Sequence, residues 1–236
     1  AVLLCAATAR ADYPHATLSR VYPPGGQRGS TFVVELQGSS LEGCEQIRVS
    51  HDGISFKHVE GVRFEAQIEA DVPVGLYDIQ AITGLGVSST RTFFVSQRGQ
   101  KVEEDPAESA DSLLLAEKGE VRTGCIGAPG DVDSFEFAAA SSDMLIIECW
   151  AERIDSVLRA TLELHGPDGR RVAVNRGFFG KDPLIAYRVP VSGRYLVKLT
   201  DLVFSGSGDH FYRLDIHDGP RVVFTMPSVV QWGVST

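Results

Sequence analysis

The sequence has no concentration of positive charge and no apolar run long enough to cross a membrane. It holds 22 Lys and Arg residues against 31 Asp and Glu residues, a formal net charge of −9. A nucleic-acid backbone has no basic cluster to pair with here, so we expect no nucleic-acid partner. The apolar run at residues 1–7 is too short to span a bilayer, and we expect no membrane insertion.

Cysteine is scarce. Four are present, Cys5, Cys44, Cys125 and Cys149, and no two have C-x-x-C spacing. This excludes a zinc site of that type and a disulfide-rich scaffold. We expect buried free thiols, which behave as small hydrophobic side chains. A bridge between Cys125 and Cys149 on neighbouring strands is the alternative.

Catalytic signatures are also missing. His51 and His58 share one loop-like stretch, but neither belongs to an H-E-x-x-H pattern. No G-x-S-x-G elbow marks a nucleophilic serine. The glycine-rich stretch at residues 25–30 leads into a strand, whereas a phosphate loop leads into a helix. The sequence therefore predicts a protein that is not an enzyme and carries no cofactor.

What is present reads as β structure almost throughout. Short segments of alternating or clustered β-formers lie between Gly, Pro and Asp turns, at 30–38, 63–70, 75–82, 89–97, 133–139, 160–166, 170–174, 193–201 and 210–218. Asp-Gly within 166–171 predicts a hairpin, and the Gly and Asp residues of 205–210 predict another. Many short strands at this spacing indicate an all-β protein built from sandwiches. Residues 143–162 conflict, because their apolar spacing also fits a helix.

The chain divides at a polar, acidic stretch. We predict a signal-peptide remnant at 1–11, ending in the A-x-A-like Ala9-Arg10-Ala11, and therefore an exported, extracytoplasmic protein. A first sandwich follows at 18–97, an acidic linker at 98–110 and a second sandwich at 110–218. Residues 220–236 share a Pro, a Gln-x-Gly and a Ser-Thr with residues 20–32, which predicts the start of a further repeat. We expect a fragment of a multidomain protein.

The second sandwich resembles the bacterial pre-peptidase C-terminal domain, a jelly-roll-like β-sandwich of secreted enzymes and surface proteins. The residues that carry the likeness are "GCIGAPGDVDSFEFAA" (124–139), "LIIECWAERIDSVLRATLELHGPDGRRVAVN" (145–175), "DPLIAYRVPVSGRYLVKLTD" (182–201) and "FYRLDI" (211–216). The resemblance implies that 143–162 is two strands separated by a loop. The first sandwich more loosely resembles the immunoglobulin-like IPT/TIG family, through residues 22–43 and 72–95.

The acidic pair Asp131 and Asp133 is a candidate calcium site. Calcium needs six to eight oxygen ligands, so two carboxylates do not suffice. The family resemblance adds acids of the linker, namely Glu103, Glu104, Asp105 and Glu108, of which we select Glu104 and Asp105. The family also has an Asn-Asp-Asp loop further along the chain, but here Arg176 follows Asn175, and its positive charge would repel the cation. The favoured alternative is a turn at Gly130-Asp131, with Asp133 hydrogen-bonded to free backbone amides at the strand start.

The loop at 175–183 is the candidate for ligand binding. Phe178 and Phe179 lie between glycines in a polar segment, with Arg176 and Lys181 beside them. Exposed aromatics could stack on a ligand or enter a partner; the alternative is that they cap the end of the sandwich or pack against the first sandwich. We therefore predict a binding, adhesion or spacer module that meets a protein or an extracellular polymer surface. Accessory domains of a secreted hydrolase, most naturally a protease, and a calcium-rigidified stalk are the alternatives.

Overall fold

The structure, a computed structural model, describes residues 14–102, 113–178, 180–220 and 226. It divides the chain into two compact units, Ala1–Gln97 and Arg98–Thr236. Each unit is a β-sandwich, which confirms the predicted all-β fold. The predicted signal remnant and nearly all of the predicted third repeat lie outside the described residues. Within the described ranges, no helix has the length and apolarity that a membrane crossing requires.

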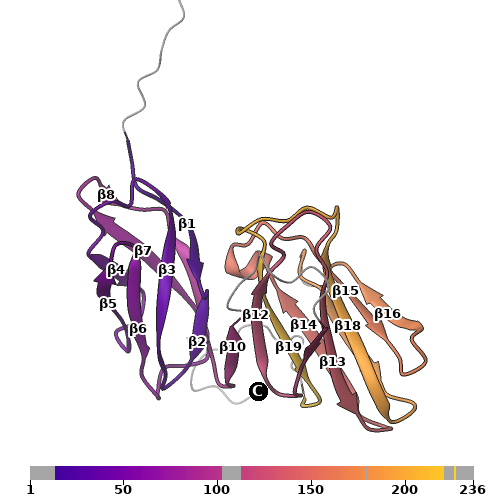
Figure 1. Cartoon of the computed structure of the whole chain (residues 1–236). Coiled ribbons are helices and arrows are strands. Elements are labelled where there is room, and N and C mark those ends of the chain that lie inside the picture. Colours follow the sequence, from indigo (N-terminus) through magenta and orange to yellow (C-terminus); the bar gives the residue numbers. More distant parts are fainter. Residues whose placement is uncertain (1–13, 103–112, 179, 221–225, 227–236) are drawn as a thin grey trace, which may run out of the picture. The chain divides into compact units, whose positions relative to one another are not determined.

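The first unit packs two mainly antiparallel sheets face to face (Figure 1). One sheet has the order β1-β3-β6-β5 and consists of β1 (Thr17–Tyr22), β3 (Thr31–Ser39), β5 (Ile54–Glu60) and β6 (Arg63–Ile68). The other has the order β2-β9-β7-β4, with β8 (Gly86–Val87) paired to β7, and consists of β2 (Gly25–Gln27), β4 (Gln46–Val49), β7 (Gly75–Thr83) and β9 (Arg91–Ser96). Strand β2 runs parallel to β9.

Alternation along the strands builds the first core. In β3, Val34 and Leu36 are fully buried while Glu35 and Gln37 between and after them are exposed. Strand β6 repeats the pattern with Phe64, Ala66 and Ile68 inside. Period-two burial of this kind allows one face of a sheet to pack on its partner while the other meets water.

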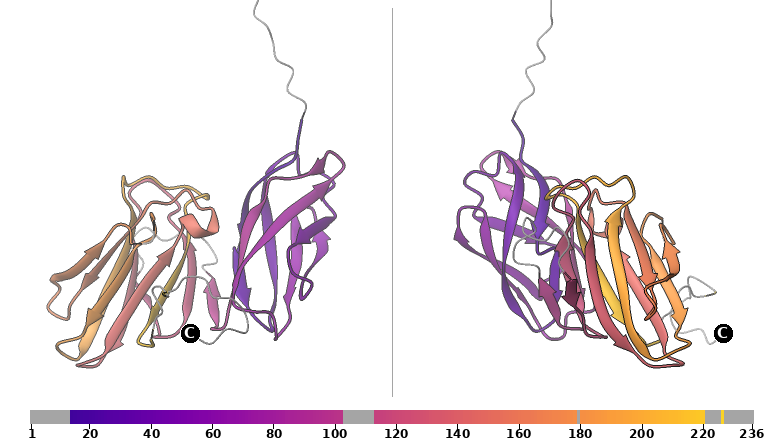
Figure 2. Two further views of the ribbon diagram at one scale, coloured as in Figure 1. Left: turned by 180° about the vertical axis from the view of Figure 1, so that it is seen from behind. Right: turned by 45° about the vertical axis from the view of Figure 1, so that its right-hand side comes forward.

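The second unit also packs two sheets. The first has the order β10-β12-β19-β14-β17 and consists of β10 (Gln100–Val102), β12 (Val121–Cys125), β14 (Met144–Trp150), β17 (Leu184–Arg188) and β19 (Phe211–His217). The second has the order β11-β13-β18-β15-β16 and consists of β11 (Leu113–Leu115), β13 (Asp133–Ala139), β15 (Ala160–His165), β16 (Arg171–Asn175) and β18 (Gly193–Asp201). The right-hand view of Figure 2 shows this second sheet with β18, in orange, at its centre. Strand β10 uses three residues of the predicted linker.

Residues 143–162 form β14, a short 3₁₀ turn η1 (Glu152–Ile154) and β15. This confirms the two-strand prediction over the helix. Strand β14 is buried on both faces from Leu145 to Cys149, so its apolar residues do not alternate. Asp155 ends the turn with a φ of 61°, in the left-handed region. A strand covered on both sides reads as a continuous apolar run, which periodicity alone does not distinguish from a helix.

One of the two predicted hairpins is correct. Strands β15 and β16 pair antiparallel around the Asp-Gly turn, closed by a hydrogen bond from the Gly166 N–H to the Arg170 carbonyl. The prediction for 205–210 is wrong, because β18 and β19 belong to different sheets. That segment is a crossing loop between the two layers of the sandwich. Gly and Asp mark a change of direction, and they do not specify which sheet the next strand joins.

The three cysteines that the structure describes are free thiols. Cys44, Cys125 and Cys149 are all buried and unbridged. Strand β19 lies between the strands that carry Cys125 and Cys149. In the ladder Cys149 is opposite Leu214 and Cys125 is opposite Phe211, so the two thiols face opposite sides of the sheet. Burial raises the pKa of the Cys149 thiol well above its usual value.

Candidate binding site

Asp131 and Asp133 have separate partners. The Asp131 carboxylate accepts the backbone N–H groups of Gly127 at 2.9 Å and Val132 at 2.8 Å. Gly130 before it has a φ of 85°, which glycine adopts without strain. Asp133 is buried and accepts the hydroxyl of Tyr212 inside the sandwich. Asp131 thus makes the amide contacts that we predicted for Asp133, and both carboxylates stabilise the start of β13.

The remaining calcium candidates, Glu104 and Asp105 with Glu103 and Glu108, lie outside the described residues. Among the side chains that the structure does describe, no group of three or more His, Cys, Asp or Glu residues could hold a metal ion. Calcium binding that relies on the acidic linker therefore stays a prediction.

The described members of the predicted ligand-binding set have different surroundings. Phe178 is 51% exposed, and Phe179 lies outside the described residues. The Lys181 ammonium pairs with Glu152 at 3.1 Å, and its backbone N–H bonds the same carboxylate. Those bonds lower the pKa of Glu152. Arg176, by contrast, lines a groove on the sheet that contains β16.

The loop that carries these residues is fixed by Asp182, which the sequence analysis did not select. Asp182 is fully buried and accepts the backbone N–H groups of Ala151, Glu152 and Arg153. The Arg153 guanidinium pairs with it at 2.7 Å. A buried carboxylate is tolerated when amides and a cation surround it. Asp182 therefore ties the 176–183 loop to the η1 turn.

The groove lies on the outer face of the sheet β11-β13-β18-β15-β16. It has a volume of about 220 Å³, and we call it the Phe204 groove; its lining residues are Val132, Thr161, Glu163, Arg176, Lys198, Thr200, Asp201, Leu202 and Phe204. Two cross-strand pairs form its floor, Thr161 opposite Thr200 and Glu163 opposite Lys198. The floor is rigid because β18 is hydrogen-bonded to strands on both sides.

Phe204 lines this groove and has a strained backbone conformation. Its side chain is 61% exposed and its φ is 57°. A bulky residue in the left-handed region is a conformational outlier that costs about 1–3 kcal/mol. Two backbone hydrogen bonds hold it there: its N–H reaches the Asp201 carbonyl at 3.1 Å, and its carbonyl accepts the Gly130 N–H at 3.0 Å.

Asp201, at the end of β18, organises the loop that presents Phe204. One carboxylate oxygen accepts the N–H groups of Val203 and Ser205 and the Ser205 hydroxyl, and the other accepts the Arg159 N–H. Burial alone would raise the pKa of Asp201, but the hydrogen bonds outweigh burial and lower it. A charged carboxylate with four donors is a firm anchor.

The same loop contains a serine–histidine chain. The Ser207 hydroxyl is 2.8 Å from Nδ1 of His210, Nε2 of His210 is 3.0 Å from the Ser205 hydroxyl, and Ser205 donates to Asp201 at 2.8 Å. In a catalytic triad the acid contacts the histidine directly. Here the acid contacts a serine, and the chain cross-links the 202–210 loop.

Some charged side chains of the groove have bonding partners and others do not. Glu163 bonds Arg171 at 2.6 Å and His165 at 3.2 Å. Burial would raise the pKa of Glu163, but these hydrogen bonds outweigh it and lower the pKa. Within the described part of the chain, the side chains of Arg176 and Lys198 make neither an ion pair nor a hydrogen bond. The groove therefore presents two uncommitted cations.

Thr161 adds a polar group at the floor. It is only 6% exposed, and its hydroxyl has no hydrogen-bond partner within the described residues. An unsatisfied buried polar group costs about 1–3 kcal/mol. Because the residue lines the groove, a ligand there could supply the partner. The floor of the groove therefore combines an unsatisfied hydroxyl with the two cations.

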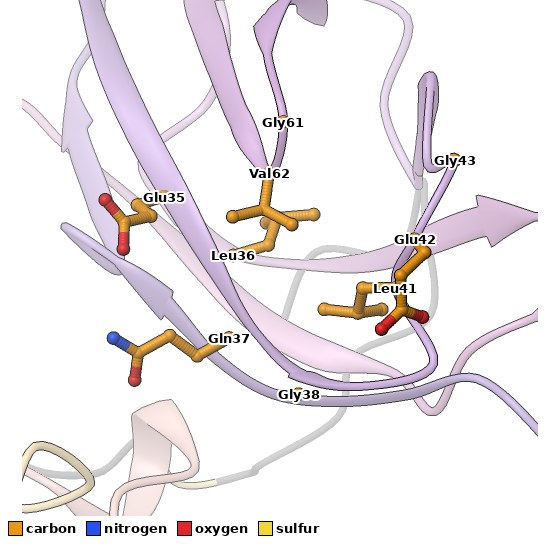
Figure 3. A pocket seen from close by; sticks show the side chains of 9 residues that line it. All are labelled: Glu35, Leu36, Gln37, Gly38, Leu41, Glu42, Gly43, Gly61 and Val62. Carbon is orange, nitrogen blue, oxygen red and sulfur yellow. The ribbon is translucent and has the colours of Figure 1, made fainter.

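The first unit has a larger hollow, of about 530 Å³, at the end of β3. Figure 3 shows Leu36, Leu41 and Val62 facing the same space, with the carboxyl groups of Glu35 and Glu42 on its two sides. Three glycines complete the rim, and two of them, Gly43 and Gly61, have left-handed φ values. The residues that line this hollow include no cation and no aromatic side chain, unlike those of the Phe204 groove, so we treat it as the weaker candidate.

Comparisons with known proteins found no family model and no curated protein that matches the chain. Solved structures do resemble it. The pre-peptidase C-terminal domain of a collagenase from Bacillus anthracis is 17% identical, covers 46% of this chain and 98% of its own, and has a TM-score of 0.37. A periplasmic inhibitor of g-type lysozyme from Aeromonas hydrophila is 14% identical over 50% of this chain and 100% of its own, with a TM-score of 0.35.

A secreted serine protease, VesC, from Vibrio cholerae is 10% identical, covers 84% of this chain and 49% of its own, and has a TM-score of 0.34. The collagenase domain belongs to the family that residues 110–218 resemble in sequence, whereas the IPT/TIG resemblance of residues 18–97 stays a prediction. TM-scores of this size do not transfer a function from those proteins to this chain.

Proposed function

We propose that the chain is a non-catalytic binding module, and that the Phe204 groove of its second sandwich holds part of the ligand. The observation that carries this is Phe204 itself, a large aromatic that is both exposed and held in a left-handed conformation. Packing does not require such a residue, since its ring is outside the core. Strained residues maintained by their surroundings cluster at binding sites.

The surroundings of Phe204 support the proposal. One carboxylate oxygen of Asp201 accepts three hydrogen bonds from the loop, and His210 cross-links two serines of the same loop. Gly206 lets the loop approach the 127–131 turn, because a Cβ there would lie 2.1 Å from the Ala128 carbonyl oxygen. A preorganised loop on a rigid sheet loses little entropy when it binds.

A non-catalytic role is favoured over a hydrolytic one for a specific reason. The described serine–histidine chain ends on Asp201 through Ser205, so no acid orients His210 as in a triad. We further propose an extracellular polymer or protein as the partner and a location outside the cytoplasm, the latter from residues 1–11 alone. Service to a secreted hydrolase encoded in the same protein is compatible with this binding role.

The test is retention on immobilised polymers. Chitin, cellulose, polygalacturonate and fibrillar collagen serve as probes for the full chain and its variants. We expect at least one polymer to retain the wild type, and Phe204→Ala to lose that retention. The matched control is Val203→Ala, since Val203 is 74% exposed beside Phe204 but does not line the groove. Retention on none of these polymers, or equal retention of wild type and Phe204→Ala, overturns the proposal.

A further inference from the structure

We infer that the Phe204 groove takes an acidic polysaccharide, one sugar residue of which lies on Phe204 with its carboxylate near Arg176 and Lys198. This rests on the proposed function and deepens it, by naming the class of ligand. Each part of the inference follows from a different set of groove residues.

The cations indicate a negatively charged ligand. Arg176 and Lys198 line one groove, and neither has an ion-pair partner among the described residues. Two carboxylates line the same groove and both are already bonded, Glu163 to Arg171 and His165, and Asp201 to backbone amides and the Ser205 hydroxyl. A guanidinium and an ammonium that line one groove without an ion-pair partner suit a carboxylate or a similar anion.

The aromatic ring indicates a ligand with a flat, partly apolar face. Phe204 has no polar atom on its side chain, so it contributes contact area and no hydrogen bond. Its strained backbone fixes where the ring stands relative to the two cations. Binding sites commonly combine one such apolar surface with a few placed polar groups. A sugar ring offers this face, whereas an acidic peptide side chain does not.

The hydroxyl groups of the floor indicate a ligand with hydroxyls of its own. Thr161 has an unsatisfied hydroxyl, and Thr200 lies directly opposite it in the ladder. Glu163 is an acceptor whose lowered pKa keeps it ionised. Hydroxyls both donate and accept, so a sugar can satisfy the threonines and donate to Glu163 at the same time.

Size and hydroxyl content favour a polysaccharide over other polyanions. At about 220 Å³ the groove is smaller than the pockets that enclose whole small molecules, and it therefore suits one unit of a chain that continues outside. A nucleic-acid strand and an acidic sugar polymer both carry one negative charge per residue, so charge alone does not separate them. The sugar polymer is better matched because its hydroxyls suit the unsatisfied Thr161 and its neighbour Thr200.

Titration calorimetry with hexagalacturonate tests the inference, on the full chain at low salt. We expect binding that maltohexaose, a neutral hexasaccharide, does not show. Phe204→Ala and Arg176→Ala are each expected to weaken it at least about tenfold. Val203→Ala and Arg170→Ala are the matched controls, because Arg170 is a solvent-exposed arginine of the β15–β16 turn outside the groove. Both controls should bind like the wild type.

Three outcomes overturn the inference. Maltohexaose binding as tightly as hexagalacturonate, with Phe204 dependence, shows a neutral-sugar site; the proposed function then survives and the ligand class is wrong. Equal binding of hexaglutamate or of oligo(dT) shows attraction to any polyanion. Absence of hexagalacturonate binding removes the acidic-sugar class, and the polymer-retention experiment then decides separately whether the groove binds anything.

Discussion

At Phe204 the backbone conformation is one that a large side chain disfavours. A φ of 57° favours glycine, yet the chain keeps an exposed phenylalanine there. We expect Phe204→Gly to relieve the strain and stabilise the second unit by up to about 1 kcal/mol, since the exposed ring contributes little packing. The same variant should lose ligand retention. Urea unfolding measures the first effect, and a loss of more than 1 kcal/mol would show that the ring is structural.

Asp201 makes the loop sensitive to acid. Its folded-state pKa is lowered from an ordinary value near 3.8. A carboxyl with a lowered pKa stabilises the fold above its unfolded pKa, and that contribution disappears as the pH falls through the folded value. We expect Asp201→Asn to cost about 1–3 kcal/mol at neutral pH, and the difference from wild type to shrink below about pH 4.

Thermal unfolding from pH 7 to pH 3 measures this difference. Asp209→Asn is the control, because Asp209 is an exposed acid in the same loop, and it should change stability by less than about 0.5 kcal/mol. A difference between wild type and Asp201→Asn that stays constant over this range would show that the Asp201 charge does not matter.

At the scale of elements, the turn before β13 bears on calcium. Asp131 already accepts hydrogen bonds from two backbone amides, and Asp133 accepts one from the Tyr212 hydroxyl. Both carboxylates therefore have hydrogen-bond partners without a cation. We expect the melting temperature of the full chain to differ by less than about 1 °C between calcium and a chelator. A ligand that binds only the folded state raises stability. An increase of several degrees with calcium would therefore show that the acidic residues 103–108 complete a site.

Strands that alternate were predictable and strands buried on both sides were not. Strand β13 places Phe135 and Phe137 inward at every second position, and the sequence showed it directly. In β14 the apolar residues Leu145, Ile146 and Ile147 are consecutive, and Glu148 and Cys149 after them are also buried, so only the family resemblance decided between strand and helix. The Gly-rich segment 205–210 predicted a turn. The sheet that β19 joins, however, depends on its packing with strands that are distant in the sequence.

The groove was predictable only in part. Arg176 was selected because it accompanies two phenylalanines, yet its groove neighbours Lys198 and Thr161 belong to other strands and are brought near by the ladder. Phe204 had one local signal, a Val-Phe pair just before Ser-Gly-Ser-Gly, where apolar residues have no strand to join. The left-handed φ that makes it informative is a property of the fold.

At the scale of the whole molecule, each unit carries a complete hydrophobic core. The first core gathers residues such as Leu36, Phe64 and Ile79, and the second gathers Phe135, Leu162 and Leu214. The two cores have no residue in common. Each is large enough to drive folding of its own sandwich, since burial of one such side chain contributes about 1.5–3 kcal/mol. The units should therefore unfold as separate cooperative transitions.

Scanning calorimetry of the full chain tests this separation. Phe64 is fully buried in the first core and Leu214 in the second. We expect Phe64→Ala to destabilise the first unit and Leu214→Ala the second, each by about 2–5 kcal/mol, because truncation leaves a cavity. Each variant should shift one transition and leave the other within about 1 °C. If both transitions move together in either variant, the two sandwiches form one cooperative unit, and Phe204 variants would then have to be assessed against the stability of the whole chain.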